Sequence, residues 1–162
     1  MNAVIEKLVA ELDNAVNGDP WFGASLKTIL SDISCEQAVI KYTENIHSIA
    51  EITHHICGWI EEVLSRIEGN EPKDPARGDW KEIANLAEVE WSNLMSSLFT
   101  AHTNLISRMK IFPFEKFEVQ VGKEKIKELG TGISYREMLV GLMEHNIYHG
   151  GQIALIKKLL EI

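Results

Sequence analysis

Two histidines one helical turn apart, His145 and His149, have the spacing in this chain that most directly indicates chemistry. Residues 134–162 show the apolar periodicity of one helix, and at that repeat both imidazoles fall within its apolar face. A buried imidazole needs a partner, because burying an unsatisfied polar group is costly. Histidines at positions i and i+4 are close enough to share one ion. The pair therefore favours a metal site; the alternative is a pair of core histidines bonded to polar groups or water.

A third ligand is expected from another helix, and residues 46–68 contain the candidates. His55 follows Ile52 by three residues, so it flanks the apolar stripe of this predicted helix. His54 is predicted to point outward, and His47 falls on the same side and is interpreted as a helix-start residue. His55 is therefore the predicted third ligand.

Three neutral imidazoles would leave the charge of a divalent ion uncompensated and one coordination position open. This arrangement is typical of catalytic sites, where the ion acidifies a bound water or thiol. Zinc and nickel both suit imidazole ligands. The predicted metal ligands are His55, His145 and His149, and the predicted cofactor is a divalent ion, zinc or nickel.

His102 poses a separate question, because it lies in the apolar stripe of residues 80–110. If successive long helices alternate in direction, counting about 1.5 Å per residue places it near the level of His55. As a fourth ligand it would close the site and make it structural. If residues 71–79 cross the bundle, the helices on either side are parallel and His102 lies two or more turns away. We predict the second arrangement, with His102 as a satisfied core residue.

Composition limits the classes of protein to which the chain can belong. With 162 residues, 45% of them hydrophobic, it suits a single globular domain over residues 1–162. A formal net charge of -8 disfavours nucleic-acid binding, which depends on clustered Lys and Arg. No apolar run approaches the ~18 residues of a membrane span, and Glu6 interrupts the region where a secretory signal would be apolar. We expect a cytoplasmic protein without nucleic-acid or membrane partners.

Four long amphipathic segments predict an all-α four-helix bundle. Residues 111–133 are predicted to form an irregular excursion before the last helix, within which residues 117–121 alternate like a short strand. A shorter helix is expected at 24–33, followed by a capping box that begins at Ser34. The long segments are residues 2–16, 46–68, 80–110 and 134–162.

The last helix carries a second apolar row beside the face that bears the histidines. A single bundle core rarely needs so wide a stripe, so the row predicts a homodimer. It consists of Gly141, Tyr148, Leu155 and Leu159.

Three segments resemble the DinB/YfiT-like family of metalloenzymes, and the resemblance covers nearly the whole chain. The last segment is the most specific, since it has the family pattern of His, three residues, His, a small residue, Gly and Gln before an apolar helix end. The resemblance implies an up-down-down-up bundle with parallel second and third helices, and it assigns the metal to the same three histidines. The segments are residues 20–26, residues 47–59 and residues 145–155.

Several branches of that family are S-transferases or isomerases that use a low-molecular-weight thiol such as bacillithiol, mycothiol or glutathione. The resemblance therefore implies a metal-dependent transferase in which the ion favours the thiolate for attack on an electrophile. Two alternatives stay open: a hydrolase that uses metal-bound hydroxide, and a metal-binding or stress-response protein without turnover. Tyr148 and Gln152 lie near the histidines along the helix, and structural roles suit them as well as catalytic ones.

Overall fold

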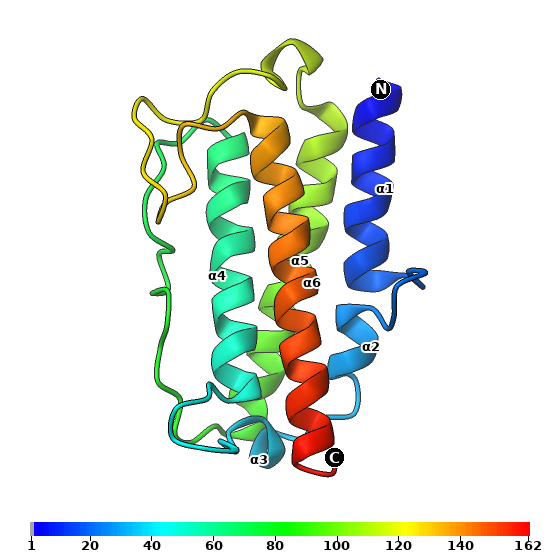
Figure 1. Ribbon diagram of the computed structural model, residues 1–162, viewed down its shortest axis with the longest axis vertical. Coiled ribbons are helices and arrows are strands. Elements are labelled where there is room, and N and C mark those ends of the chain that lie inside the picture. The colour runs from blue at the N-terminus through cyan, green and yellow to red at the C-terminus, as the bar shows by residue number, and fades with distance from the viewer. Residues whose placement is uncertain (1) are drawn as a thin grey trace.

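The computed structural model describes residues 2–162 and shows four long helices with shorter ones between them (Figure 1). The all-α prediction is confirmed. Where a strand was predicted, at residues 117–121, the chain forms turns and a single isolated bridge between Gln120 and Ser134. The helices are α1 (Ala3–Asn17), α2 (Leu26–Leu30), α3 (Cys35–Ala38), α4 (Ile49–Ile67), α5 (Glu88–Ile111) and α6 (Tyr135–Leu159), with a 3₁₀ turn η1 at Phe114–Lys116.

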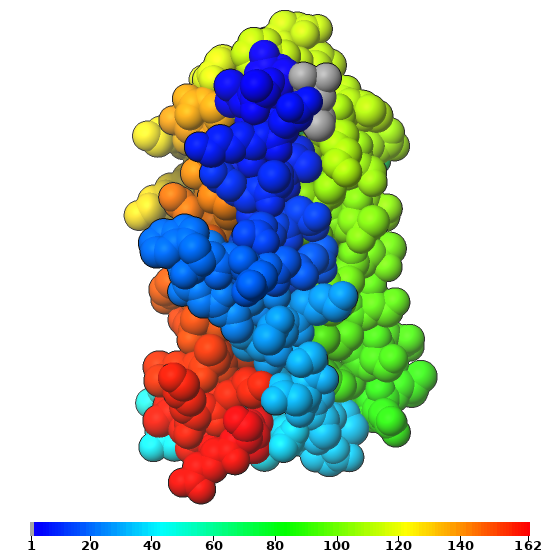
Figure 2. Space-filling view, turned by 90° about the vertical axis from the view of Figure 1, so that its right-hand side faces the viewer, coloured from blue at the N-terminus to red at the C-terminus, as the bar shows by residue number. Residues whose placement is uncertain are grey.

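The four long helices pair by direction. In Figure 1, α4 and α5 both run upward, whereas α1 and α6 run downward. Figure 2 shows the side of the bundle that is on the right in Figure 1, where α1 and the short helices lie between α6 and α5. Since α4 and α5 have the same direction, residues 68–87 must return along the whole length of the bundle, and they do so beside α4.

Side-chain caps explain where most of these helices begin. Ser48 precedes α4 and Ser134 precedes α6, and each serine forms a reciprocal capping box with the glutamate three residues later. The predicted capping box at Ser34 is also present and starts α3. Capping satisfies backbone N–H groups that the first helical turn leaves without partners.

The predicted start of the third long helix at residue 80 is wrong, because α5 begins only at Glu88. Residues 80–87 are instead held in a non-helical path along α4. The Ile83 N–H donates a hydrogen bond to Glu51 Oε1 at 3.2 Å, and Glu51 is buried. A tertiary hydrogen bond to a buried carboxylate therefore prevails over the helical periodicity that Trp80 and Ala84 display.

Two further glutamates of α4 hold the returning segment, residues 68–87. Glu62 Oε1 accepts from the Lys73 N–H at 2.9 Å, and Glu61 forms a two-point ion pair with Arg77. Gly58 allows the close approach, since a Cβ there would lie 3.1 Å from Pro75 Cβ. The returning segment is thus attached to α4 at several levels.

His102 is a core residue of α5, as predicted, and its side chain faces α1. Its side chain is completely buried, and its Nε2–H donates to Asp13 Oδ1 at 3.1 Å. Burial lowers the pKa of the His102 imidazole, and the Asp13 carboxylate opposes that effect. His102 therefore stabilises the contact between α1 and α5.

We predict that His102→Gln lowers the free energy of unfolding by about 1 kcal/mol, because it disturbs a buried hydrogen bond. Urea denaturation measures the change. The matched control is Thr103→Ala at the exposed neighbouring position, which should stay close to wild type. Equal stability of the two variants would contradict a structural role for His102.

Candidate metal centre

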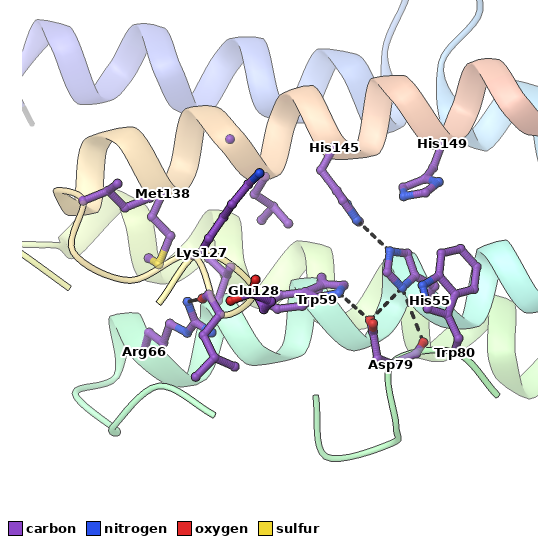
Figure 3. A pocket seen from close by; sticks show the side chains of 16 residues that line it. His55, Trp59, Arg66, Asp79, Trp80, Lys127, Glu128, Met138, His145 and His149 are labelled. Atoms are coloured by element: carbon purple, nitrogen blue, oxygen red, sulfur yellow. Dashed lines mark hydrogen bonds and ion pairs between the residues drawn. The ribbon is translucent and has the colours of Figure 1, made fainter. Parts of the chain in front are cut away.

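Three histidines from two helices meet between α4 and α6. His55 is on α4, and His145 and His149 are on α6 (Figure 3). One nitrogen of each ring lies within 4.8 Å of the others, and the Nε2 atoms of His55 and His145 are 2.8 Å apart. His55 and His149 are buried. The structure therefore brings together the three residues that the sequence predicts as metal ligands, in a geometry that could hold one divalent ion.

The Nδ1 atom of each ring, which faces away from the cluster, lies near an oxygen atom. His55 Nδ1 lies 2.9 Å from Asp79 Oδ1, and His149 Nδ1 lies 2.6 Å from Gln152 Oε1. Since a carboxylate oxygen and an amide oxygen accept hydrogen bonds, both Nδ1 atoms carry a hydrogen in the neutral rings. The Nε2 atoms of His55 and His149 therefore present lone pairs, which is the state in which imidazole binds a metal.

Gln152 has its orientation set by Tyr148. The Gln152 Nε2–H₂ group donates to the Tyr148 hydroxyl at 3.1 Å, so its Oε1 atom is turned toward His149. The sequence left the roles of both residues open, and the structure gives them a part in positioning His149. In the third ring, His145 Nδ1 lies 3.4 Å from Asn146 Oδ1.

Asp79 and Trp80 belong to this site but were not identified from the sequence. The Asp79 carboxylate accepts from Trp59 Nε1 at 2.8 Å as well as from His55. The Trp80 ring stacks on His55 with centroids 3.9 Å apart. Both residues lie on the returning segment, so they approach His55 only because that segment runs along α4. A periodicity argument that placed Trp80 in a helix could not reveal this.

Two more histidines lie in or just before α4, and both are outside the cluster. They are His47 and His54. His47 precedes the capping residue Ser48, as predicted, and its ring stacks on the other face of Trp80 at 3.9 Å. His54 was predicted to point outward, which is wrong, because its side chain is only 7% exposed. The returning segment covers that side of α4, and Arg77 and Lys81 line the same cavity as His54.

Burial keeps the clustered imidazoles neutral. It is the main cause that lowers the pKa of His55, His145 and His149, and the charges of neighbouring histidines add to it for His55 and His145. The pKa of His145 falls from 6.5 to about 4. At neutral pH the three rings are therefore free to act as ligands without first losing a proton.

A cavity of about 360 Å³ begins at the histidines and extends between α4 and α6. Residues 127–130 of the excursion before α6 lie against it, as Figure 3 shows for Lys127 and Glu128. Its size falls in the range of about 300–1,000 Å³ typical of small-molecule sites. A ligand could therefore reach the three histidines.

Comparison with known families agrees with this arrangement. A model of the DinB superfamily matches residues 23–153, which include all three histidines. The chain belongs to the DinB superfamily. No curated protein and no solved structure is significantly similar to this DinB-superfamily chain. Among its described helices, none is both long enough and apolar enough to cross a bilayer.

We predict that His145 stays neutral well below pH 6.5 in the metal-free protein and titrates near pH 4. Because its pKa is depressed on folding, the unfolded chain binds more protons in this interval, and stability falls as the pH drops through it. Imidazole NMR measures the protonation, and urea denaturation at each pH measures the stability. Titration of His145 at pH 6.5 in the folded protein would contradict the burial argument.

Proposed function

We propose that His55, His145 and His149 hold one divalent metal ion, zinc or nickel. The observation that carries the proposal is the convergence of three ring nitrogens whose outer partners are oxygen acceptors. Without an ion, one hydrogen shared between His55 Nε2 and His145 Nε2 accounts for their separation of 2.8 Å. With an ion in its place, His145 would carry its hydrogen on Nδ1, beside Asn146 Oδ1.

Chemically, the donor set fits this assignment. Imidazole nitrogen is a preferred ligand of zinc and of nickel, and three protein ligands leave a position for a small molecule. Asp79 and Gln152 would orient two of the rings, as outer partners do in known zinc sites. Among the described residues, no carboxylate or cysteine is grouped with the three histidines as a further ligand for the ion.

We further propose that the protein is a metal-dependent transferase that acts on a low-molecular-weight thiol and an electrophile. A bound divalent ion would lower the pKa of a thiol at its open position and so supply the thiolate nucleophile. The protein itself would hold the ion and bind the second reactant. His55, His145 and His149 hold the ion, and the cavity beside them receives the second reactant.

A direct assay tests the transferase proposal. Protein loaded with zinc or nickel is incubated separately with bacillithiol, mycothiol and glutathione, each with a panel of alkyl and aryl electrophiles. Consumption of one thiol, with its conjugate identified by mass spectrometry, is expected for the loaded protein and not for the metal-free protein. If no thiol is consumed while the ion stays bound, the transferase proposal fails and the metal proposal stands.

Removing one ligand tests the metal proposal itself. We predict that His149→Ala loses most of the bound ion, because two imidazoles hold a divalent ion far more weakly than three. Elemental analysis of purified protein measures occupancy, expected near one ion per wild-type chain. His54→Ala removes a neighbouring buried histidine outside the cluster and should keep its metal. Full occupancy in a folded His149→Ala variant would refute the assignment.

We also propose that the protein forms a homodimer through the outer face of α6. Tyr148, Leu155 and Leu159 are 63%, 57% and 39% exposed, and apolar side chains in a row on one helix are typical of an interface. Light scattering at micromolar concentration should report twice the chain mass. Leu155→Glu should give the monomer, and a monomeric wild type would remove the idea.

A further inference from the structure

The cavity beside the histidines is long rather than round. His55 lies at one end on α4 and Arg66 at the other, and on α6 the corresponding residues are His149 and Met138. Both pairs are eleven residues apart, which at 1.5 Å per residue corresponds to about 16 Å along the helices. A ligand that reaches the histidines therefore has room for a long body.

Apolar side chains make up most of the wall between the two ends. From α4 come Trp59 and Val63, from α6 come Met138 and Leu142, and Ile133 precedes α6. Val63, Met138 and Leu142 are themselves buried. Burial of apolar surface here is favourable for an apolar ligand, in proportion to the area removed from water.

The polar groups inside this wall already have partners. The Arg66 guanidinium donates to Glu62 Oε1 at 2.9 Å and to the Leu129 carbonyl at 2.7 Å, and its side chain is almost completely buried. Trp59 Nε1 is bound to Asp79. Consequently, no buried cation on this wall is left to receive a phosphate or carboxylate in the middle of a ligand.

The Asp79 carboxylate lies at the histidine end of the cavity, where His55 and Trp59 both donate hydrogen bonds to it. Two further charged side chains of the lining, among the residues that the structure describes there, form no ion pair. They are Lys127 and Glu128, both exposed. Exposed charges contribute little to affinity because water screens them. The wall between the two ends of the cavity therefore stays mainly apolar.

We infer that the substrate acted on at the three histidines carries an extended alkyl or aryl body, uncharged over its length, that lies between Trp59 and Met138. This inference rests on the proposed metal site for the reactive end of the ligand and extends it to the other end. An apolar electrophile fits this description, whereas a sugar phosphate or nucleotide does not.

Linear alkyl hydroxamic acids are suitable probes, because the hydroxamate group chelates a divalent ion and the chain length can be varied. Calorimetry with zinc-loaded protein compares the butyl, hexyl, octyl and decyl compounds. Each added methylene should tighten binding about fourfold until the cavity is filled. Alkyl amides of the same lengths serve as controls without a chelating group.

Two glycines of α6 provide a matched pair of variants. A side chain added at Gly141 or at Gly151 would meet no atom within 4 Å of its Cβ, and both positions are exposed, but only Gly141 lines the cavity. Gly141→Leu should remove the dependence on chain length while butyl hydroxamate still binds. Gly151→Leu should behave as wild type.

The outcomes separate the inference from the proposed metal site. If affinity does not rise with chain length in wild-type protein, or rises equally in Gly141→Leu, the apolar-body inference is overturned. If hydroxamates bind no better than amides but both series show the chain-length dependence, the inference stands and the metal proposal fails.

Discussion

The parallel direction of α4 and α5 is the constraint on which the site depends. A chain that leaves α4 at one end of the bundle must return to the other end before α5 can begin. Residues 68–87 form this connection. Hydrogen bonds to Glu62, Glu61 and Glu51 hold this segment against α4. At residues 80–87 these contacts hold the chain outside a helix, although its apolar periodicity predicted one.

The returning segment also completes the surroundings of His55. Asp79 accepts hydrogen bonds from His55 and Trp59, and Trp80 covers the face of the His55 ring. On α6, Gln152 accepts a hydrogen bond from His149 and so orients that ring. Two rings are thus held from different helices by separate partners, and their inner nitrogens converge. Burial then keeps the rings neutral, so protons compete weakly with an ion for those nitrogens at neutral pH.

Periodicity and capping patterns were sufficient to predict the helices and to select His55, His145 and His149 as the group that should meet. The i and i+4 spacing of two histidines depends only on local helical geometry, which a sequence displays directly. The start of α5, the burial of His54 and the roles of Asp79 and Trp80 could not be predicted. All of them depend on the path of the returning segment, residues 68–87. Tertiary contacts to α4 determine that path, and local sequence patterns do not show them.

X-ray absorption spectroscopy of the metal-loaded protein tests the central claim most directly, because it reports the atoms bound to the ion. The proposed site predicts three imidazole nitrogens at about 2.0–2.1 Å from zinc, together with the outer-ring scattering typical of histidine. The same spectrum should lose imidazole scattering in His149→Ala. A first shell of oxygen atoms, with no imidazole contribution in the wild-type protein, would contradict the proposed centre.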